Sequence, residues 1–381
     1  MHRTLAKNVI VLEDSHKVSF GGGQKGTLEV MEALSSSYHI YLFDSTKQSG
    51  FYQKAIQRKY KVYQLYSFGK IVGGKKASFS IGILEVLLYP IFTFLNILKL
   101  VFFLKKRKLT RHNTVVYTSA KKMLAPTLFI HKIFKIKYVY HARNYYDRNS
   151  FYFKVLTFLL SKATLVISVS HTVLQNLGHP RSIVIYNPIK LNTPLPSPRQ
   201  IDPTKVIVAA FASLIPWKGL EYFMKSFSFL RNKNNVQYHI YGKGQEQKYL
   251  SKLTNDQVLL KGFTDKTEEI MEGQVNIICV PSISEEAFGR VSIEGFKFGI
   301  PAISTNIGGQ KELIKDNFNG FHVPIMDPKA IAEKIDYLIE NPTIYTELSQ
   351  NALAYVKEFD YTSFSKRIKT QFDNIFSNQI S

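Results

Sequence analysis

Two carboxylates, Glu286 and Glu294, stand eight residues apart in a stretch that is rich in glycine. Glu286 falls in an expected loop, and Glu294 falls about one turn into the helix expected over residues 291–298. A carboxylate can accept two hydroxyl hydrogen bonds at once, which suits the diol of a ribose or a hexose. Gly289 precedes the helix, and the N–H groups and positive dipole end of a helix start suit a diphosphate. The stretch therefore indicates a site for a nucleotide sugar.

The elements that follow would hold this site in place. Gly299 is a natural left-handed residue after the helix, and Pro301 prevents the helix from continuing. Residues 302–304 form a short apolar run that is typical of a buried parallel strand. Gly308 and Gly309 then open a second expected helix near Glu312. The alternative interpretation is two solvated glutamates around an ordinary helix start, and the surrounding glycines favour the ligand site.

The whole stretch resembles the signature of glycosyltransferase family 4. The matching residues are Glu286, Phe288, Gly289, Glu294, Gly299, Pro301, Gly308, Gly309 and Glu312. The resemblance extends over nearly the whole chain, and its C-terminal motifs are specific. It implies a retaining enzyme of the GT-B fold, an α/β protein whose two Rossmann-like, doubly wound domains face a cleft.

The resemblance also implies roles for single residues. Catalytic roles would fall to His141, Lys218 and Glu286. Contacts to the donor nucleotide would come from Gly21, Gly22, Ser213, Lys218, Phe263, Phe288, Gly289, Arg290, Val291 and Glu294. Three of these have ordinary alternatives: His141 could cap a strand end, Gly21 and Gly22 could make a plain tight turn, and Lys218 could be a solvated lysine at a helix start.

One position departs from the family pattern. Ser213 stands where the family usually has an arginine that holds the diphosphate together with a lysine, here Lys218. Arg290 and Arg143 are the candidates for a replacement cation, although Arg143 could also be a surface residue. Ser213 could instead donate a single hydroxyl hydrogen bond.

No metal is expected at this site. The chain has no Asp-x-Asp motif, and its ten histidines show no ligand spacing. Lys218 and the helix dipoles would then neutralise the departing diphosphate. No carboxylate nucleophile is evident, which is compatible with front-face attack in which the leaving phosphate takes the acceptor proton, as the family resemblance implies. No cofactor is expected besides the nucleotide-sugar substrate.

Strands and helices alternate in both halves, which predicts two doubly wound parallel sheets. The expected domains are an acceptor-binding domain over residues 1–187 and a nucleotide-sugar-binding domain over residues 205–360. Five prolines in residues 188–204 predict an extended linker between them. Residues 361–381 are expected to form a terminal helix that, in this fold, crosses back to the first domain.

The charge of the chain is divided unevenly. The net charge is +22, and residues 1–200 hold 30 Lys and Arg against 7 Asp and Glu, while residues 201–381 hold 20 against 21. The first half must therefore face an anionic partner, either a membrane with acidic lipid or nucleic acid. No nucleic-acid module is recognisable, so we expect no nucleic acid. The single cysteine, Cys279, excludes a disulfide within the chain.

Residues 79–104 form the most apolar long segment. Its length would span a bilayer, but Glu85, Pro90, Asn96 and Lys99 interrupt it, so a core helix with one membrane-facing side is the better interpretation. The basic run 105–108 follows at once. With no secretory signal in the first residues, we expect a cytoplasmic protein that is peripheral on the inner face of the cell membrane.

The expected function is transfer of a sugar from a nucleotide-diphosphate sugar to a lipid-linked glycan in cell-surface polysaccharide synthesis. A UDP-sugar is favoured and GDP-mannose is possible, with a hexosyl or N-acetylhexosaminyl group as the cargo. A polyprenyl-diphosphate-linked acceptor would explain the basic first half. The alternatives are an epimerase of the GT-B fold and a basic nucleic-acid-binding protein.

Overall fold

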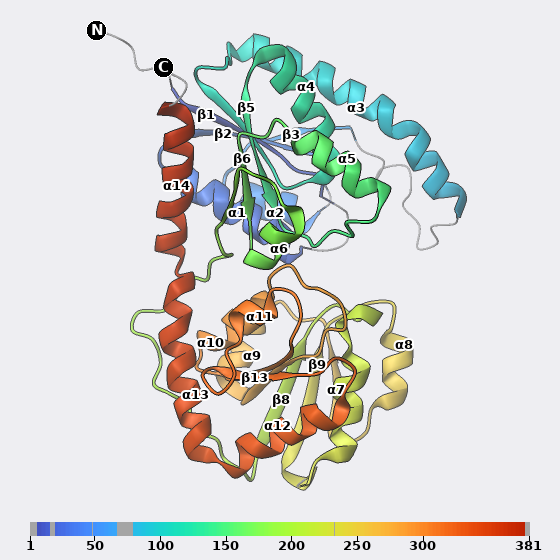
Figure 1. Cartoon of the computed structure of the whole chain (residues 1–381), viewed down its shortest axis with the longest axis vertical. Coiled ribbons are helices and arrows are strands. Elements are labelled where there is room, and N and C mark those ends of the chain that lie inside the picture. The colour runs from blue at the N-terminus through green and yellow to red at the C-terminus, as the bar shows by residue number, and fades with distance from the viewer. Residues whose placement is uncertain (1–5, 16–19, 48, 67–78, 232, 378–381) are drawn as a thin grey trace. The chain divides into compact units, whose positions relative to one another are not determined.

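A computed structural model describes residues 6–15, 20–47, 49–66, 79–231 and 233–377, and for residues 79–87 it describes the backbone alone. The chain forms two compact units, each built on its own parallel sheet (Figure 1). The first unit comprises Met1–Val169, Leu174–Ile185 and Phe364–Ser381, and the second comprises Ser170–Val173 and Tyr186–Ser363. This architecture confirms the α/β class expected from the alternation of strands and helices.

The sheet of the first unit has seven parallel strands in the order β3-β2-β1-β4-β5-β6-β7. Every residue of β1 and β4 is buried, because helices cover both faces of such a sheet and its central strands are nearly continuous apolar runs. The strands are β1 (Asn8–Leu12), β2 (His39–Asp44), β3 (Val62–Gln64), β4 (Thr114–Thr118), β5 (Lys137–Ala142), β6 (Leu165–Ser168) and β7 (Ser182–Val184).

The last helix of the chain packs within the first unit. Tyr38 donates a hydrogen bond of 2.5 Å from its hydroxyl to Asp373, and its ring stacks on Phe376 with centroids 5.3 Å apart. The helices α1–α6 and α14 are α1 (Gly22–Leu34), α2 (Gly50–Gln57), α3 (Phe79–Arg107), α4 (Leu124–Phe134), α5 (Phe151–Leu160), α6 (His171–Leu177) and α14 (Tyr361–Ser377).

The long apolar segment is α3, and one side of it packs on the sheet. The Phe103 ring lies 5.0 Å from that of Tyr41 and 4.8 Å from that of Tyr63, and Asn96 bonds both backbone groups of Tyr66. The stretch Leu88–Arg107 is long and apolar enough to cross a membrane. One side of α3 belongs to the core of the unit, as expected, while 22% of the apolar stretch is buried, and the membrane-facing role of its other side stays a prediction.

The sheet of the second unit has six parallel strands in the order β10-β9-β8-β11-β12-β13. The strands are β8 (Val206–Phe211), β9 (Val236–Tyr241), β10 (Val258–Gly262), β11 (Ile277–Val280), β12 (Ala302–Thr305) and β13 (Gly320–Val323). Around them lie α7 (Leu220–Ser226), α8 (Gln247–Leu250), α9 (Thr267–Gln274), α10 (Arg290–Phe296), α11 (Gln310–Leu313), α12 (Pro328–Glu340) and α13 (Pro342–Tyr355).

The proline-rich segment is fastened to the second unit, whereas the sequence predicted an extended linker. The guanidinium of Arg199 donates to the carbonyls of Phe298, Val275, Met271 and Glu272, and the Arg199 backbone N–H donates to Ser349. A guanidinium has five donors in a fixed fork, so one side chain can bind several carbonyl ends at once. Proline content predicted the extended backbone but not this anchor.

Candidate functional site

The switch point of the second sheet brings the predicted donor residues together. β8 and β11 are neighbours, yet the chain leaves β8 toward β9 and leaves β11 toward β12, on opposite sides. Loops that diverge in this way leave a crevice at the carboxyl ends of the strands, where open α/β sheets bind ligands. The loop after β8 carries Ser213 and Lys218, and the loop after β11 carries Glu286 and Gly289.

The two loops pack directly on one another. The backbone N–H of Ile283 donates a 2.9 Å hydrogen bond to the carbonyl of Trp217. Gly219 has a φ of +63°, and a Cβ there would lie 2.0 Å from the carbonyl oxygen of Pro281. Only glycine permits both the left-handed backbone and this close approach, so Gly219 fixes the position of Lys218 relative to the second loop.

Lys218 and Glu286 form an ion pair. The Lys218 ammonium and the Ser282 hydroxyl both donate to Oε1 of Glu286. The Glu286 side chain is 8% exposed and the Lys218 side chain is 19% exposed, so the pair is shielded from water but open on one side. The sequence assigned these residues to different parts of the donor, and the structure places their charged groups in contact.

The start of α10 requires glycine. Gly289 has a φ of +100°, and a Cβ there would lie 2.0 Å from Nε2 of Gln310. Gln310 is fully buried and accepts a 2.9 Å hydrogen bond from Ser292, while its Nε2 has no hydrogen-bond partner among the described residues. Sequence reasoning missed Gln310; its place directly after Gly308 and Gly309 was the available signal.

The two charged residues of α10 face each other. Nε of Arg290 lies 3.8 Å from Oε1 of Glu294, and Nη2 of Arg290 donates to the carbonyl of Pro188 at 3.1 Å. Both side chains are largely buried, with 11% and 14% exposed. The proposed cation Arg290 is therefore already engaged by Glu294 and by the segment that follows β7, and Val291 lies directly after it at the helix start.

One expectation for this stretch is corrected, and the other, a helix near Glu312, is confirmed as a very short helix. α10 ends at Phe296 rather than Phe298, although Gly299 does adopt the expected left-handed backbone with a φ of +66°. The second expected helix, α11, is a single turn of four residues, and the N–H of Gly309 already bonds the carbonyl of Glu286 at 2.7 Å. A one-turn helix sums few peptide dipoles, so the N-terminus of α11 would contribute little to binding an anionic ligand.

Glu312 is the last residue of the family-like motif, and its carboxylate accepts hydrogen bonds from backbone N–H groups. It accepts hydrogen bonds from the N–H groups of His171 at 2.8 Å and Thr172 at 2.6 Å. The Thr172 hydroxyl and the Tyr186 hydroxyl also donate to it. With four donors around one carboxylate, Glu312 has a structural role in the second unit.

The aromatic residues predicted at the site differ in exposure. The ring of Phe288 is buried against Tyr186 and Phe359, with centroids 5.8 Å and 6.1 Å away, so only its backbone could contact a ligand. Phe263, for which the family resemblance implied a contact to the donor nucleotide, is 62% exposed just after β10, and the Lys243 ammonium lies 4.3 Å from its ring centroid. Ser213 is exposed and adds no cation.

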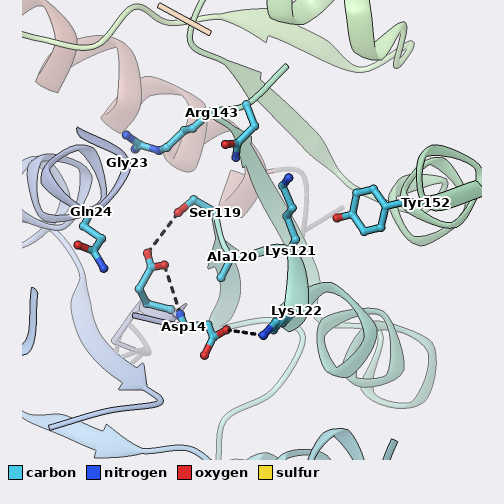
Figure 2. Close-up of a pocket in the computed structure, with 11 residues that line it drawn as sticks. Asp14, Gly23, Gln24, Ser119, Ala120, Lys121, Lys122, Arg143 and Tyr152 are labelled. Carbon is cyan, nitrogen blue, oxygen red and sulfur yellow. Dashed lines mark hydrogen bonds and ion pairs between the residues drawn. The ribbon is translucent and has the colours of Figure 1, made fainter. Parts of the chain in front are cut away.

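The switch point of the first sheet lies between β1 and β4, and it contains a cavity of about 710 Å³. Figure 2 shows its polar walls, to which the loop after β1 contributes Asp14 and the segment after β4 contributes Lys121 and Lys122. Its lining residues are Glu13, Asp14, Gly23, Gln24, Ser119, Ala120, Lys121, Lys122, Arg143, Asn144 and Tyr152.

Gly21 and Gly22 stand at the start of α1, beside this cavity. α1 begins at Gly22, and the Gln24 side chain accepts a hydrogen bond from the Gly21 N–H at 3.2 Å. Both glycines are exposed, and a Cβ at Gly21 would meet nothing within 4 Å. Their contact to the donor stays a prediction.

His141 lies inside β5, one residue before the strand ends at Ala142, so it does not cap the strand end from outside. Its Nδ1 lies 2.8 Å from the hydroxyl of Tyr117 and 3.1 Å from Nη2 of Arg143. A guanidinium can only donate, so Nδ1 is an acceptor and the ring proton is on Nε2. Burial and the adjacent Arg143 hold the pKa of His141 well below its usual value, so the ring is neutral.

This geometry makes His141 a hydrogen-bond donor. Its Nε2 is buried and has no hydrogen-bond partner among the described residues. Arg143 is not a plain surface residue, because its guanidinium also donates to Tyr117 at 3.2 Å and a Cβ at Gly26 would lie 1.4 Å from its Nη1. The ring can therefore act only as a neutral hydrogen-bond donor through Nε2, and it cannot act as a cationic acid near neutral pH.

Comparison with known proteins finds a family match within the second unit. Residues 194–355 match the family model described as glycosyl transferases group 1. This span contains the loop after β8, the loop after β11 and α10. The chain spans about half or less of the length of the curated relatives it matches.

Two of these relatives come from Staphylococcus aureus. The chain is 29% identical over 153 residues to the capsular polysaccharide biosynthesis glycosyltransferase CapM, covering 38% of this chain and 40% of that protein. It is 27% identical over 157 residues to a poly(ribitol-phosphate) alpha-N-acetylglucosaminyltransferase, covering 39% of this chain and 31% of that protein.

A solved structure matches nearly the whole chain. The crystal structure of Anabaena Alr3699/HepE in complex with UDP has a TM-score of 0.78 at 20% identity, covering 96% of this chain and 100% of that one. At this identity the likeness concerns the fold. It confirms the predicted class, a GT-B protein with two Rossmann-like α/β domains.

Proposed function

We propose that the chain is a glycosyltransferase that binds a nucleotide-diphosphate sugar at the switch point of the second sheet. The observation that carries the proposal is the grouping there of Lys218, Glu286, Glu294 and the glycine-started helix α10. Lys218 would stabilise the negative charge that develops on the departing diphosphate. Glu294 would accept hydrogen bonds from the ribose, and Glu286 would hold hydroxyls of the sugar.

The donor that we propose is a UDP-sugar, with GDP-mannose as the second candidate. HepE, which shares the fold, was crystallised with UDP and with UDP-glucose. The exposed ring of Phe263 would stack on the base. The transferred group would be a hexosyl or N-acetylhexosaminyl residue.

The reaction that we propose is retaining, as in glycosyltransferase family 4. A front-face route needs no carboxylate nucleophile: the acceptor oxygen bonds to the anomeric carbon as the bond to the phosphate oxygen breaks, and that phosphate oxygen takes the acceptor proton. Lys218 would stabilise the phosphate while this occurs. His141, a neutral donor, would orient the sugar through Nε2.

The acceptor that we propose is a lipid-linked glycan of cell-surface polysaccharide synthesis, such as a polyprenyl-diphosphate-linked sugar. Two relatives act, by their names, in capsular polysaccharide biosynthesis and on poly(ribitol-phosphate). The excess positive charge of residues 1–200 would attract an anionic acceptor and the acidic membrane that carries it.

A surface of the first unit supports membrane attachment. α3, α4 and α5 pack one beside the next (Figure 1). We name their outward apolar side the three-helix face, and its exposed residues are Ile91, Phe94, Leu98 and Phe102 of α3, Phe129 and Ile133 of α4, and Phe151, Val155 and Phe158 of α5. Soluble proteins seldom expose so many large apolar side chains together, and such patches mark interaction sites.

Lysines border the three-helix face. The ammonium of Lys106 lies 5.9 Å from the ring centroid of Phe102, and that of Lys132 lies 5.9 Å from that of Phe158. Apolar rings flanked by cations match the interface of a bilayer that contains acidic lipid. We therefore propose that the protein is peripheral on the cytoplasmic face of the membrane and docks through this face.

The test of the enzymatic proposal is incubation of the purified protein with a panel of UDP- and GDP-sugars, with and without membrane lipid extract. Slow release of nucleoside diphosphate from one donor, accelerated by the extract, is the expected result. Formation of an epimerised nucleotide sugar would instead indicate an epimerase. Binding of nucleic acid without turnover of any donor would contradict the proposal.

A further inference from the structure

The cavity at the switch point of the first sheet contains a buried acid that the donor site does not use. Glu13 is the first residue after β1 and is 6% exposed. Among the described residues, no lysine or arginine pairs with it within ion-pair distance. Arg143 attracts the carboxylate electrostatically but does not form an ion pair with it. A buried carboxylate without a paired cation is costly, which points to a ligand or a proton as its missing partner.

The hydrogen bonds of Glu13 leave room for one more donor. Its Oε2 accepts from the hydroxyls of Thr27 at 2.9 Å and Ser119 at 3.2 Å, and its Oε1 accepts from the backbone N–H of Asp14 at 3.3 Å. A carboxylate offers about four acceptor positions. Three are therefore taken by groups that hold the side chain still, and a hydroxyl in the cavity could take the fourth.

The other wall of the cavity carries cations. The ammonium of Lys121 lies 4.8 Å from the Tyr146 ring centroid and 5.4 Å from that of Tyr152 and, among the described residues, is paired with no carboxylate (Figure 2). Lys122 stands beside it, 4.0 Å from Asp14. Carboxylates can accept hydrogen bonds from sugar hydroxyls, and the Lys121 ammonium can bind a phosphate. A cavity that contains both groups therefore suits a sugar that bears a phosphate.

We propose that this cavity binds a phosphorylated sugar as the acceptor, with Glu13 accepting the hydrogen bond of a sugar hydroxyl and Lys121 binding the phosphate. The inference rests on the proposed function and assigns the phosphate-bearing sugar of the proposed acceptor to this cavity. The cavity lies wholly within the first unit, so its residues can be tested apart from the donor site of the second unit.

Glu13 should make sugar binding depend on pH. Burial, offset in part by the Thr27 hydrogen bond, raises the pKa of Glu13 to about 7. The nearby charged and titratable groups are Asp14, Asp44 on β2, Tyr117 on β4, Lys121, Lys122, and Arg143 after β5. Only the ionised carboxylate accepts at all four positions, so hydroxyl binding should strengthen as pH rises through 7.

The experiment measures binding of glucose 1-phosphate, glucose and inorganic phosphate to the full chain by calorimetry or ligand-detected NMR. We expect glucose 1-phosphate to bind at least tenfold more tightly than either of the others. Glu13→Gln should weaken glucose and glucose 1-phosphate about tenfold and leave phosphate unchanged. Lys121→Ala should weaken the two phosphates and leave glucose unchanged.

The pH arm uses glucose, because a sugar phosphate titrates near pH 6 itself. Between pH 6 and 8 its affinity for the wild type should rise several-fold, and its affinity for Glu13→Gln should stay flat. Thr27→Val removes one hydrogen bond to the carboxylate at nearly constant shape and should move the rise to higher pH. Glu32→Gln, a change on the same helix α1 at a residue that pairs with Arg58, is the control and should match the wild type.

Either of two results would overturn the inference: wild type that binds none of the three probes, or Glu13→Gln that binds glucose 1-phosphate as well as wild type does. UDP binding is measured on the same samples and should be unaffected by any of these changes. If UDP binds and the sugar phosphate does not, the acceptor assignment fails alone. If neither UDP nor any nucleotide-sugar donor binds while the sugar phosphate does, the proposed transfer reaction is contradicted.

Discussion

Lys218 and Glu286 contact each other across 68 residues of sequence, and Ser282 donates to the same carboxylate oxygen. In the proposed reaction Lys218 binds the diphosphate in addition to its ion pair with Glu286. The ion pair therefore positions the Lys218 ammonium before the donor binds. Preorganised charge of this kind costs no rearrangement at the moment of reaction.

Lys218→Ala should remove this charge. We expect UDP to bind about 10- to 150-fold more weakly, because a hydrogen bond to a charged group contributes about 1.5–3 kcal/mol. Donor hydrolysis should fall further than binding, since the developing charge is largest in the transition state. Glu286→Gln should keep UDP affinity within about threefold and still reduce turnover at least tenfold. Equal loss of UDP affinity in both variants would contradict the separate roles.

Glu294→Ala should weaken UDP by a similar amount, because it removes the acceptor of the ribose hydroxyls. Isothermal titration with UDP and with uracil measures the effect, and uracil, which lacks the ribose, should bind both proteins alike. Glu340→Ala, at a residue that pairs with Arg231 in the same unit, is the control. Unchanged UDP affinity in Glu294→Ala would remove the ribose assignment.

Gly289→Ala should destabilise the second unit by about 1–3 kcal/mol, because a φ of +100° is strained for alanine and its Cβ would lie 2.0 Å from Gln310. Urea unfolding measures the change. Gly273→Ala, in α9 where a Cβ meets nothing within 4 Å, should be neutral or slightly stabilising. Part of the loss in free energy of unfolding comes from the clash with Gln310 and part from backbone strain. Adding Gln310→Ala to Gly289→Ala should remove the loss due to the clash and leave the loss due to strain.

His141 should make the free energy of unfolding fall on acidification. Its pKa is well below 6.5 in the folded protein, through burial and then Arg143, whereas the unfolded side chain titrates normally. Below pH 6.5 the unfolded state therefore binds a proton that the folded state does not, and stability decreases as pH falls. His141→Gln should show a shallower decline between pH 6.5 and 5 in denaturant titrations. Parallel curves for the two proteins would show that His141 is not held neutral.

Membrane binding should require both the basic run 105–108 and the three-helix face. Each Lys or Arg near an acidic surface contributes about 1 kcal/mol, so changing these four residues to serine should nearly abolish co-sedimentation with acidic liposomes. The charge-matched control changes four exposed lysines of the second unit, Lys248, Lys252, Lys311 and Lys329, and should bind as wild type does.

Two further comparisons separate the contributions to membrane binding. Changing Phe94, Leu98 and Phe102 to serine should weaken binding even at low salt, where electrostatic attraction is strongest. Binding of wild type should fall as salt rises. Equal binding to neutral and acidic liposomes, or none to either, would contradict the electrostatic part of the proposal.

Much of the fold followed from local pattern in the sequence. The apolar run 302–304 lies in β12 (Ala302–Thr305), as predicted, because period and turn residues are local signals. Glycine context and spacing predicted Glu286 and Glu294 for the donor, and the family resemblance predicted Lys218; these roles stay predictions. Gly299 was assigned its left-handed role correctly for the same reason.

Strand order was decided only by the tertiary structure. Sequence indicates that strands exist, but packing of helices on both faces determines which strands are neighbours, and so puts the switch points between β1 and β4 and between β8 and β11. That order gathers Glu13, Ser119 and Lys121 around one cavity, although 106 residues separate Glu13 from Ser119. It also turns Lys218 and Glu286 into a pair and buries Gln310 against Gly289. These contacts depend on the three-dimensional path of the chain, and no local period in the sequence encodes them.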